Sequence, residues 1–132
     1  MEQNGVTAHD SCVLVVDDLE FMRTAIRDIL RNAGFKRIHE AVNGRDALLQ
    51  FEKVDPDIVL LDIVMPEMDG ISVLSQIMRR HPGARVIMCS ALGEQEMIIR
   101  AIQLGARDFV VKPFKPERVT SAVHKVLGLD VA

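Results

Sequence analysis

The stretch CVLVVDD at residues 12–18 is an apolar run that ends in two carboxylates. Short runs rich in Val, Ile and Leu, placed between helix-like segments, are typical of strands buried on both faces of a parallel sheet. A helical pattern follows at once, because apolar side chains recur at helical spacing from Phe21 to Ala33. Residues 12–33 therefore predict a strand followed by a helix.

Two later apolar runs also end in a charge. Residues 58–61 lead into Asp62, and residues 109–111 lead into Lys112. Ligand sites of open α/β sheets lie at the carboxyl ends of the strands, so we expect these side chains to meet the two carboxylates of the first run. The sequence thus predicts three carboxylates and one ammonium at one edge of a sheet.

The rest of the chain repeats this alternation of strand and helix. Gly34, the pair Asp55-Pro56 and Gly105 separate helices from strands. We expect strands at residues 12–16, 37–42, 57–61, 85–90 and 108–111, with a helix after each. Right-handed crossovers place such helices on both faces of the sheet. The prediction is an α/β fold, a single-domain flavodoxin-like (βα)5 doubly wound parallel sheet with strand order 2-1-3-4-5.

Length and composition fit one globular domain. The 132 residues are 48% hydrophobic and carry a net charge of −3, with 16 scattered basic residues, which disfavours both disorder and a nucleic-acid partner. The sequence has no apolar run near the roughly 20 residues that span a bilayer, so we expect no membrane insertion and a cytoplasmic location. We divide the chain into a flexible tail at residues 1–11, a domain at 12–128 and a C-terminal tail at 129–132.

Cys12 and Cys89 are expected to be buried free thiols.

The acidic cluster predicts a metal and phosphate site. Three carboxylates held together repel one another, and a hard divalent cation, Mg²⁺ (or Mn²⁺), would compensate their charge. Lys112 supplies a point charge suited to a phosphate oxygen, and Ser90 adds a hydroxyl at the end of the fourth strand. This combination favours phosphoryl transfer to one of the carboxylates.

Ordinary structural roles explain some of these residues taken singly. Asp18 and Asp69 would serve as helix caps, and Ser90 as a common strand-end residue. Capping does not explain Asp62, which ends an apolar run seven residues before Asp69, nor the lysine at the end of the fifth strand. We therefore favour the joint, functional interpretation.

Four motifs of the chain together resemble a known family. They are VVDD at residues 15–18, LDIVMPEMDG at 61–70, MCSA at 88–91 and DFVVKPF at 108–114. Over residues 12–127 the chain resembles the receiver domain of two-component response regulators, and among these the single-domain regulators of chemotaxis. The resemblance implies a signalling protein that is not an enzyme beyond its own phosphorylation and dephosphorylation. The implied partners are a histidine kinase, a downstream output protein and a phosphatase.

The resemblance also implies which residues bind metal and phosphate. Asp62 would be the phosphoacceptor, taking a phosphoryl group from a phosphohistidine of the kinase. Asp17, Asp18 and Asp62 would bind Mg²⁺, Asp17 largely through water, and the backbone carbonyl of Val64 would complete the protein ligands. Lys112 would pair with the phosphoryl group.

The same resemblance implies a conformational switch. The Ser90 hydroxyl would bind the phosphoryl group, and the aromatic Phe109 would move inward as the hydroxyl moves. The output surface would consist of the fifth strand with the fourth and fifth helices. Apolar residues of the fourth helix cover more than one face, so some of them must stay exposed.

On that helix we expect Ile99 and Ile102 to pack in the core, because together with Ala106 they follow the spacing of core residues. Ile98 and Ala101 should then be exposed on the output surface. Scattered surface hydrophobes remain the alternative explanation.

Three apolar side chains lead to predictions about the position of the switch residue Phe109 and about the lifetime of the acyl phosphate. Phe109 has no hydroxyl to anchor an outward rotamer, so we expect its ring to favour the inward position before phosphorylation. Val64 and Leu92 occupy positions that flank the path of hydrolytic water in this family. Neither side chain can orient water, so the acyl phosphate should hydrolyse slowly. Simple packing against loops is the alternative for both residues.

Two other functions remain open from the sequence. One is an enzyme that uses an aspartyl phosphate as an intermediate, a phosphatase or phosphotransferase. The other is the receiver portion of a longer DNA-binding transcriptional regulator. A nucleotide-binding flavodoxin-like domain is disfavoured, because no Gly-rich loop follows residues 12–16.

Overall fold

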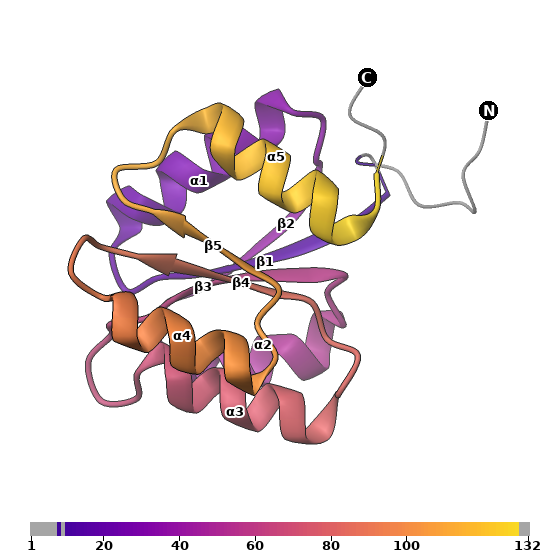
Figure 1. Cartoon of the computed structure of the whole chain (residues 1–132). Coiled ribbons are helices and arrows are strands. Elements are labelled where there is room, and N and C mark those ends of the chain that lie inside the picture. Colours follow the sequence, from indigo (N-terminus) through magenta and orange to yellow (C-terminus); the bar gives the residue numbers. More distant parts are fainter. Residues whose placement is uncertain (1–7, 9, 130–132) are drawn as a thin grey trace.

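The computed structural model describes residue 8 and residues 10–129, and it confirms the predicted alternation (Figure 1). The strands are β1 (Cys12–Val16), β2 (Arg37–Ala41), β3 (Ile58–Asp62), β4 (Val86–Ser90) and β5 (Asp108–Val111). The helices are α1 (Glu20–Asn32), α2 (Gly44–Val54), α3 (Gly70–Arg80), α4 (Gln95–Leu104) and α5 (Pro116–Leu127). The strands pair in parallel in the order β2-β1-β3-β4-β5, as predicted.

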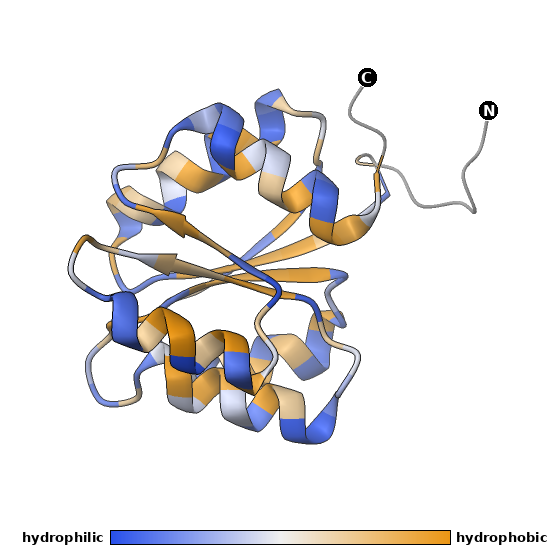
Figure 2. Cartoon of the chain, in the orientation of Figure 1, coloured by the Kyte–Doolittle hydropathy of each residue, from blue (hydrophilic) through white to orange (hydrophobic). Residues whose placement is uncertain are grey.

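Successive residues of each central strand belong to two different cores. Leu14 and Val16 of β1 pack in the core beneath α2, α3 and α4, whereas Val13 and Val15 pack in the core beneath α1 and α5. Because side chains alternate along a strand, a run that is apolar at every position needs cover on both faces. Figures 1 and 2 show the two helical layers and the hydrophobic strands between them.

Local side-chain bonds start two of the helices. The Asn43 side chain accepts a hydrogen bond from Asp46 N at 2.7 Å at the start of α2. Asp69 accepts one from Ser72 N at 2.9 Å at the start of α3. Each bond satisfies an N–H of the first turn, which has no partner within the helix. The predicted cap at Asp69 is thus confirmed.

Four strand limits differ from the prediction by one residue: β3 and β4 each begin one residue later, at Ile58 and Val86, and the last residues of β2 and β3 also differ. β3 includes Asp62, because its ladder with β4 continues as far as the pair Asp62 and Cys89. β2 ends at Ala41 rather than Val42, whose N–H donates to Asp46 Oδ2 at 3.0 Å. The inclusion of Asp62 in β3 affects the site, because this residue is held by the sheet rather than by a loop.

The predicted tails lie mostly outside the described residues. At the described positions of these segments, Ser11 is buried, and Ala8 and Leu129 pack against the core beneath α1 and α5. Removal of the apolar side chains of Ala8 and Leu129 from water accounts for their packing.

Cys12 and Cys89 are buried free thiols, as predicted. Burial raises the pKa of both thiols, so they remain neutral and behave as small apolar side chains. Within the described part of the chain, no helix combines the length and the apolar character needed to cross a membrane.

Candidate functional site

The three predicted carboxylates converge at the carboxyl edge of the sheet. Asp17, Asp18 and Asp62 each offer an oxygen atom, and these atoms lie within 4.8 Å of one another. β1 and β3 are parallel neighbours, with Val16 opposite Leu61, so both strands end at the same edge. The side chains of Asp17 and Asp62 are only 1% and 6% exposed, whereas Asp18 is partly buried.

Lys112 joins this cluster as predicted. Its Nζ donates to Asp62 Oδ1 at 3.0 Å and to Asp17 Oδ2 at 3.2 Å. The backbone N–H of Lys112 donates to the carbonyl of Ser90 at 2.7 Å, and the Ser90 residue is buried. The ammonium therefore connects the ends of β1, β3 and β5.

Crowding changes the acid-base properties of Asp62. Burial raises the pKa of this carboxyl to about 6, the charge of Asp17 adds to the rise, and Lys112 opposes it. Burial lowers the pKa of Lys112, but its hydrogen bond and charge interaction with Asp62, followed by Asp17, outweigh that effect and raise the pKa overall. At neutral pH the lysine is charged and Asp62 is mainly ionised.

The oxygen atoms of the cluster fit a hard divalent cation. Mg²⁺ prefers carboxylate and carbonyl oxygens and keeps several waters in its shell. Three carboxylates meet here against one lysine, so negative charge is in excess when all three are ionised. Val64 lies two positions after Asp62 in the loop that leads to α3, with an exposed side chain.

The loop after β3 folds tightly against the strand end. Gly70 N donates to the carbonyl of Ile63 at 2.7 Å, and a Cβ at Gly70 would clash with the carbonyl oxygen of Asp62. A glycine is therefore required for this close approach. The pair Asp69-Gly70 serves two purposes, because one residue caps α3 and the other leaves room for the chain that carries Asp62.

The start of α1 differs from the capping alternative considered for Asp18. The residue before the helix is Leu19, whose side chain makes no cap, and its N–H donates to Asp17 Oδ1 at 2.9 Å. The cap interpretation of Asp18 is wrong, because α1 begins only at Glu20 and Asp18 lies before the cap position.

Sequence reasoning missed an ion-pair network behind Asp17. Arg23 donates to the Asp17 carbonyl oxygen at 2.9 Å and to Glu40 Oε1 at 2.9 Å. Arg27 donates to the other Glu40 oxygen at 2.9 Å. A signal was present, since Arg23 lies one turn before the buried Ile26 on the same face of α1. A charged side chain at such a position needs a partner.

The exposed residues of α4 are not the predicted pair. Ile99 and Ile102 are 59% and 45% exposed, whereas Ala101 is buried and Ile98 packs against the core. α4 contacts α3 as well as β4, so its buried stripe includes Ala101 rather than Ile102. The prediction that Ile98 and Ala101 are exposed is wrong.

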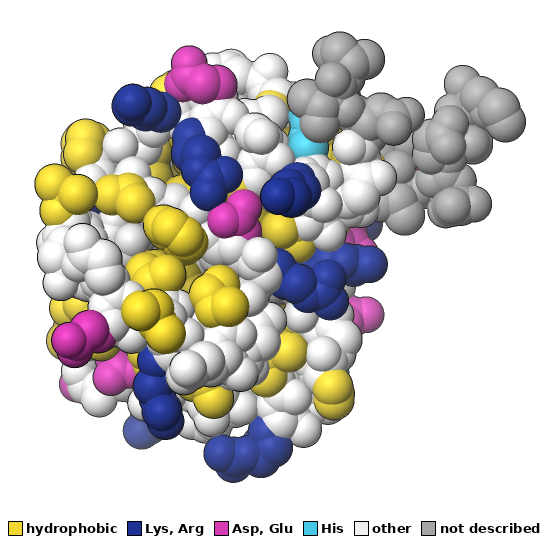
Figure 3. Space-filling view, viewed as in Figure 1, with side chains coloured by type: hydrophobic (Ala, Val, Ile, Leu, Met, Phe, Trp, Pro, Cys, Tyr) yellow, Lys and Arg dark blue, Asp and Glu magenta, His cyan; other side chains and the backbone are white. Residues whose placement is uncertain are grey.

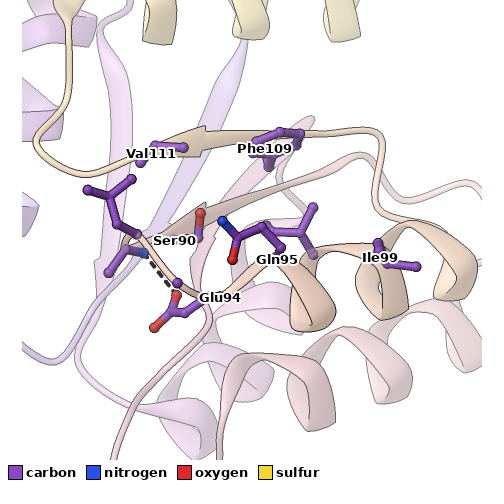
Figure 4. A pocket seen from close by; sticks show the side chains of 10 residues that line it. Ser90, Glu94, Gln95, Ile99, Phe109 and Val111 are labelled. Atoms are coloured by element: carbon purple, nitrogen blue, oxygen red, sulfur yellow. Dashed lines mark hydrogen bonds between the residues drawn. The ribbon is translucent and has the colours of Figure 1, made fainter.

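Phe109 lies beside a cavity of about 380 Å³ whose lining includes Ser90, Ile99 and Val111. Phe109 is 37% exposed, so it is only partly withdrawn from water, and its inward bias stays a prediction. Figure 4 shows Phe109 and Val111 on β5, across the cavity from Gln95 and Ile99 of α4. Figure 3 shows hydrophobic side chains gathered over this region of α4 and β5. Phe109 lines this cavity from β5, the strand at the end of the strand order.

Residues 13–124 match the family model of the response regulator receiver domain. The chain belongs to this family. The receiver domain is 51% identical to chemotaxis protein CheY of Thermotoga maritima over 114 residues, which cover 86% of this chain and 95% of the relative. It is 52% identical to CheY of Listeria monocytogenes over 113 residues, covering 86% and 95%. The crystal structure of the CheX–CheY–BeF3–Mg²⁺ complex from Borrelia burgdorferi contains a similar chain, with a TM-score of 0.83, 40% identity and 88% coverage of both chains.

Replacing Asp62 with Asn tests the electrostatics of the site. The pKa of this carboxyl is about 6 in the folded receiver domain, against an ordinary value of 3.8. The folded state therefore binds more protons than the unfolded state between these values, and wild-type stability falls as pH rises through them. Without divalent ions, Asp62→Asn should be more stable than wild type by about 1–2 kcal/mol near pH 7.5 and about equally stable near pH 4.

Urea unfolding followed by circular dichroism measures this difference. Asp28→Asn, which removes an exposed carboxylate of α1, is the matched control and should show no such dependence on pH. A loss of stability in Asp62→Asn near pH 7.5 would contradict the account.

Proposed function

We propose that this receiver domain is a cytoplasmic, chemotaxis-type response regulator whose Asp62 accepts a phosphoryl group from the phosphohistidine of a histidine kinase. The observation that carries the proposal is the contact of Lys112 Nζ with Asp62 Oδ1 at 3.0 Å inside a cluster of three carboxylates. The similarity to two proteins named chemotaxis protein CheY supports the chemotaxis assignment. The only chemistry proposed is the domain's own phosphorylation and dephosphorylation.

The transfer step uses Asp62 as the nucleophile. A carboxylate oxygen of Asp62 attacks phosphorus, a P–O bond forms, the P–N bond breaks, and the leaving imidazole takes up a proton. With a pKa of about 6, the carboxyl is mainly ionised and nucleophilic at neutral pH. The Lys112 ammonium then pairs with one phosphoryl oxygen, and the Ser90 hydroxyl donates a hydrogen bond to another.

Asp17, Asp18, Asp62 and the backbone carbonyl of Val64 are the proposed ligands of Mg²⁺ (or Mn²⁺). When bound, the cation neutralises charge on the carboxylates and on the transferring phosphoryl group. The hydrogen bond from Arg23 to the Asp17 carbonyl oxygen holds the chain that carries two of these ligands.

Ser90 and Phe109 are the proposed switch. Movement of Ser90 toward the phosphoryl group lets the Phe109 ring enter the neighbouring cavity, which changes the surface formed by α4, β5 and α5 for a downstream protein. Ile99 and Ile102, rather than Ile98 and Ala101, are the large apolar residues of α4 exposed on this output surface. A change from 1:99 to 99:1 between the two states requires about 5.5 kcal/mol from the phosphoryl group. The Borrelia burgdorferi complex with CheX and BeF3 supports a further partner that acts on the phosphorylated form, which we propose is a phosphatase.

Phosphorylation by a small phosphodonor tests the proposed function. With acetyl phosphate and Mg²⁺, intact-protein mass spectrometry should show one added phosphoryl group on wild type and none on Asp62→Ala, because the nucleophile is lost. Chelation of the cation should also abolish labelling. Asp28→Ala is the matched control and should be labelled like wild type. Labelling of Asp62→Ala, or turnover of an added substrate, would count against the proposal.

The lifetime of the acyl phosphate depends on the side chains near the proposed water path. Val64 and Leu92 are 54% and 82% exposed, so polar replacements there do not disturb the core. Val64→Asn combined with Leu92→Glu should speed dephosphorylation about tenfold, because amide and carboxylate groups can orient water. Decay of the labelled protein measures the rate, and Leu49→Glu provides an exposed apolar control away from the phosphorylation loops. An unchanged rate in the double variant would refute the idea.

A further inference from the structure

The main chain of Phe109 is bonded to two side chains at the open edge of the sheet. In the described part of the chain, β5 ends the strand order and pairs with β4. Phe109 N–H donates to Asp108 Oδ1 at 2.7 Å, and the Phe109 carbonyl accepts from Arg118 Nη2 at 2.7 Å. The same Arg118 nitrogen donates to Asp108 Oδ1 at 3.0 Å. We call this closed set of bonds, formed by Asp108, Arg118 and the main chain of Phe109, the Phe109 clamp.

The Phe109 clamp connects the edge strand to α5. Arg118 lies in the first turn of that helix, next to Val119, which is fully buried in the core. The side chains of Asp108 and Arg118 are 18% and 44% exposed, and an ion pair of this exposure adds little stability by itself. Its main effect is geometric, because Arg118 of α5 holds the Phe109 carbonyl directly and also holds the Asp108 carboxylate that accepts from the Phe109 N–H.

Phe109 is only partly withdrawn from water. The residue Phe109 is 37% exposed although it borders a cavity lined by the apolar side chains of Ile98 and Ile99 (Figure 4). An apolar ring gains free energy when it leaves water, and this one has no hydroxyl to bond at the surface. The Phe109 clamp holds the main chain of this residue. It therefore acts against the gain in free energy that would draw the ring into the cavity.

We infer that Arg118 and Asp108 are positioning residues that hold Phe109 outward and so oppose the phosphorylated state. The inference rests on the proposed function, because it assigns the clamp a part in the switch of that site. An interaction that favours the outward state must weaken binding of a phosphoryl group, or of its mimic, at Asp62. Releasing the clamp therefore tightens that binding.

Beryllofluoride with Mg²⁺ serves as the phosphoryl mimic in the test. Calorimetric titration should show about fivefold tighter binding to Arg118→Gln than to wild type, the size expected for loss of a charge-assisted hydrogen bond at a partly exposed site. Arg118→Lys, which keeps the charge, should fall between the two. Arg107→Gln, the same change at an exposed arginine just before β5, is the matched control and should bind like wild type.

The ring position gives a second measurement. In protein labelled with fluorophenylalanine, the ¹⁹F resonance of Phe109 is identified by its loss in Phe109→Leu. In ligand-free Arg118→Gln this resonance should move toward its position in wild type saturated with the mimic. If Arg118→Gln does not fold, Asp108→Asn tests the same clamp, because it removes the charge of the pair and keeps an oxygen for the Phe109 N–H.

The outcomes separate the clamp from the proposed function. A merely structural role predicts lower stability with unchanged or weaker binding of the mimic, and that result overturns the inference. If wild type binds the mimic and shifts its Phe109 resonance while both clamp variants behave like wild type, only the clamp is wrong. If wild type fails to bind the mimic, the proposed function is contradicted and the clamp's role with it.

Discussion

One ammonium between two buried carboxylates is the interaction on which this site depends. Lys112 Nζ contacts both Asp62 and Asp17, whose side chains are almost wholly buried. Without a cation, their mutual repulsion and loss of hydration would favour the protonated form of at least one acid. A single lysine reduces this cost but leaves negative charge in excess, so the pKa of Asp62 stays raised at about 6. The same imbalance makes the oxygen atoms of the cluster suitable ligands for a divalent cation.

The fold and the cluster of charged residues could be predicted because both depend on the pattern of the strands. Apolar runs without polar alternation indicate a sheet covered on both faces, and parallel strands bring their carboxyl ends to one edge. The charges that end the runs at Asp62 and Lys112 therefore fall together, and the structure brings them within 3.0 Å. Their roles came from the family resemblance, since spacing alone indicated only a metal and phosphate site.

Other features depend on contacts that leave no periodic signal. α4 carries apolar residues on more than one face, and only its packing against α3 and β4 decides that Ala101 is buried and Ile102 exposed. The bond from Arg118 to the Phe109 carbonyl joins a side chain to a main-chain group nine residues earlier, which no hydrophobic pattern encodes. The inward bias expected for Phe109 came from the chemistry of its ring alone and took no account of these bonds to its main chain.

The pKa of Asp62 is the most direct measure of the central interaction. The side-chain carboxyl ¹³C shift of Asp62, followed by NMR against pH without divalent ions, should titrate with a pKa of about 6. In Lys112→Met the pKa should rise further, because the opposing positive charge is gone. Titration of wild type at the ordinary value of 3.8, unchanged in Lys112→Met, would contradict the account.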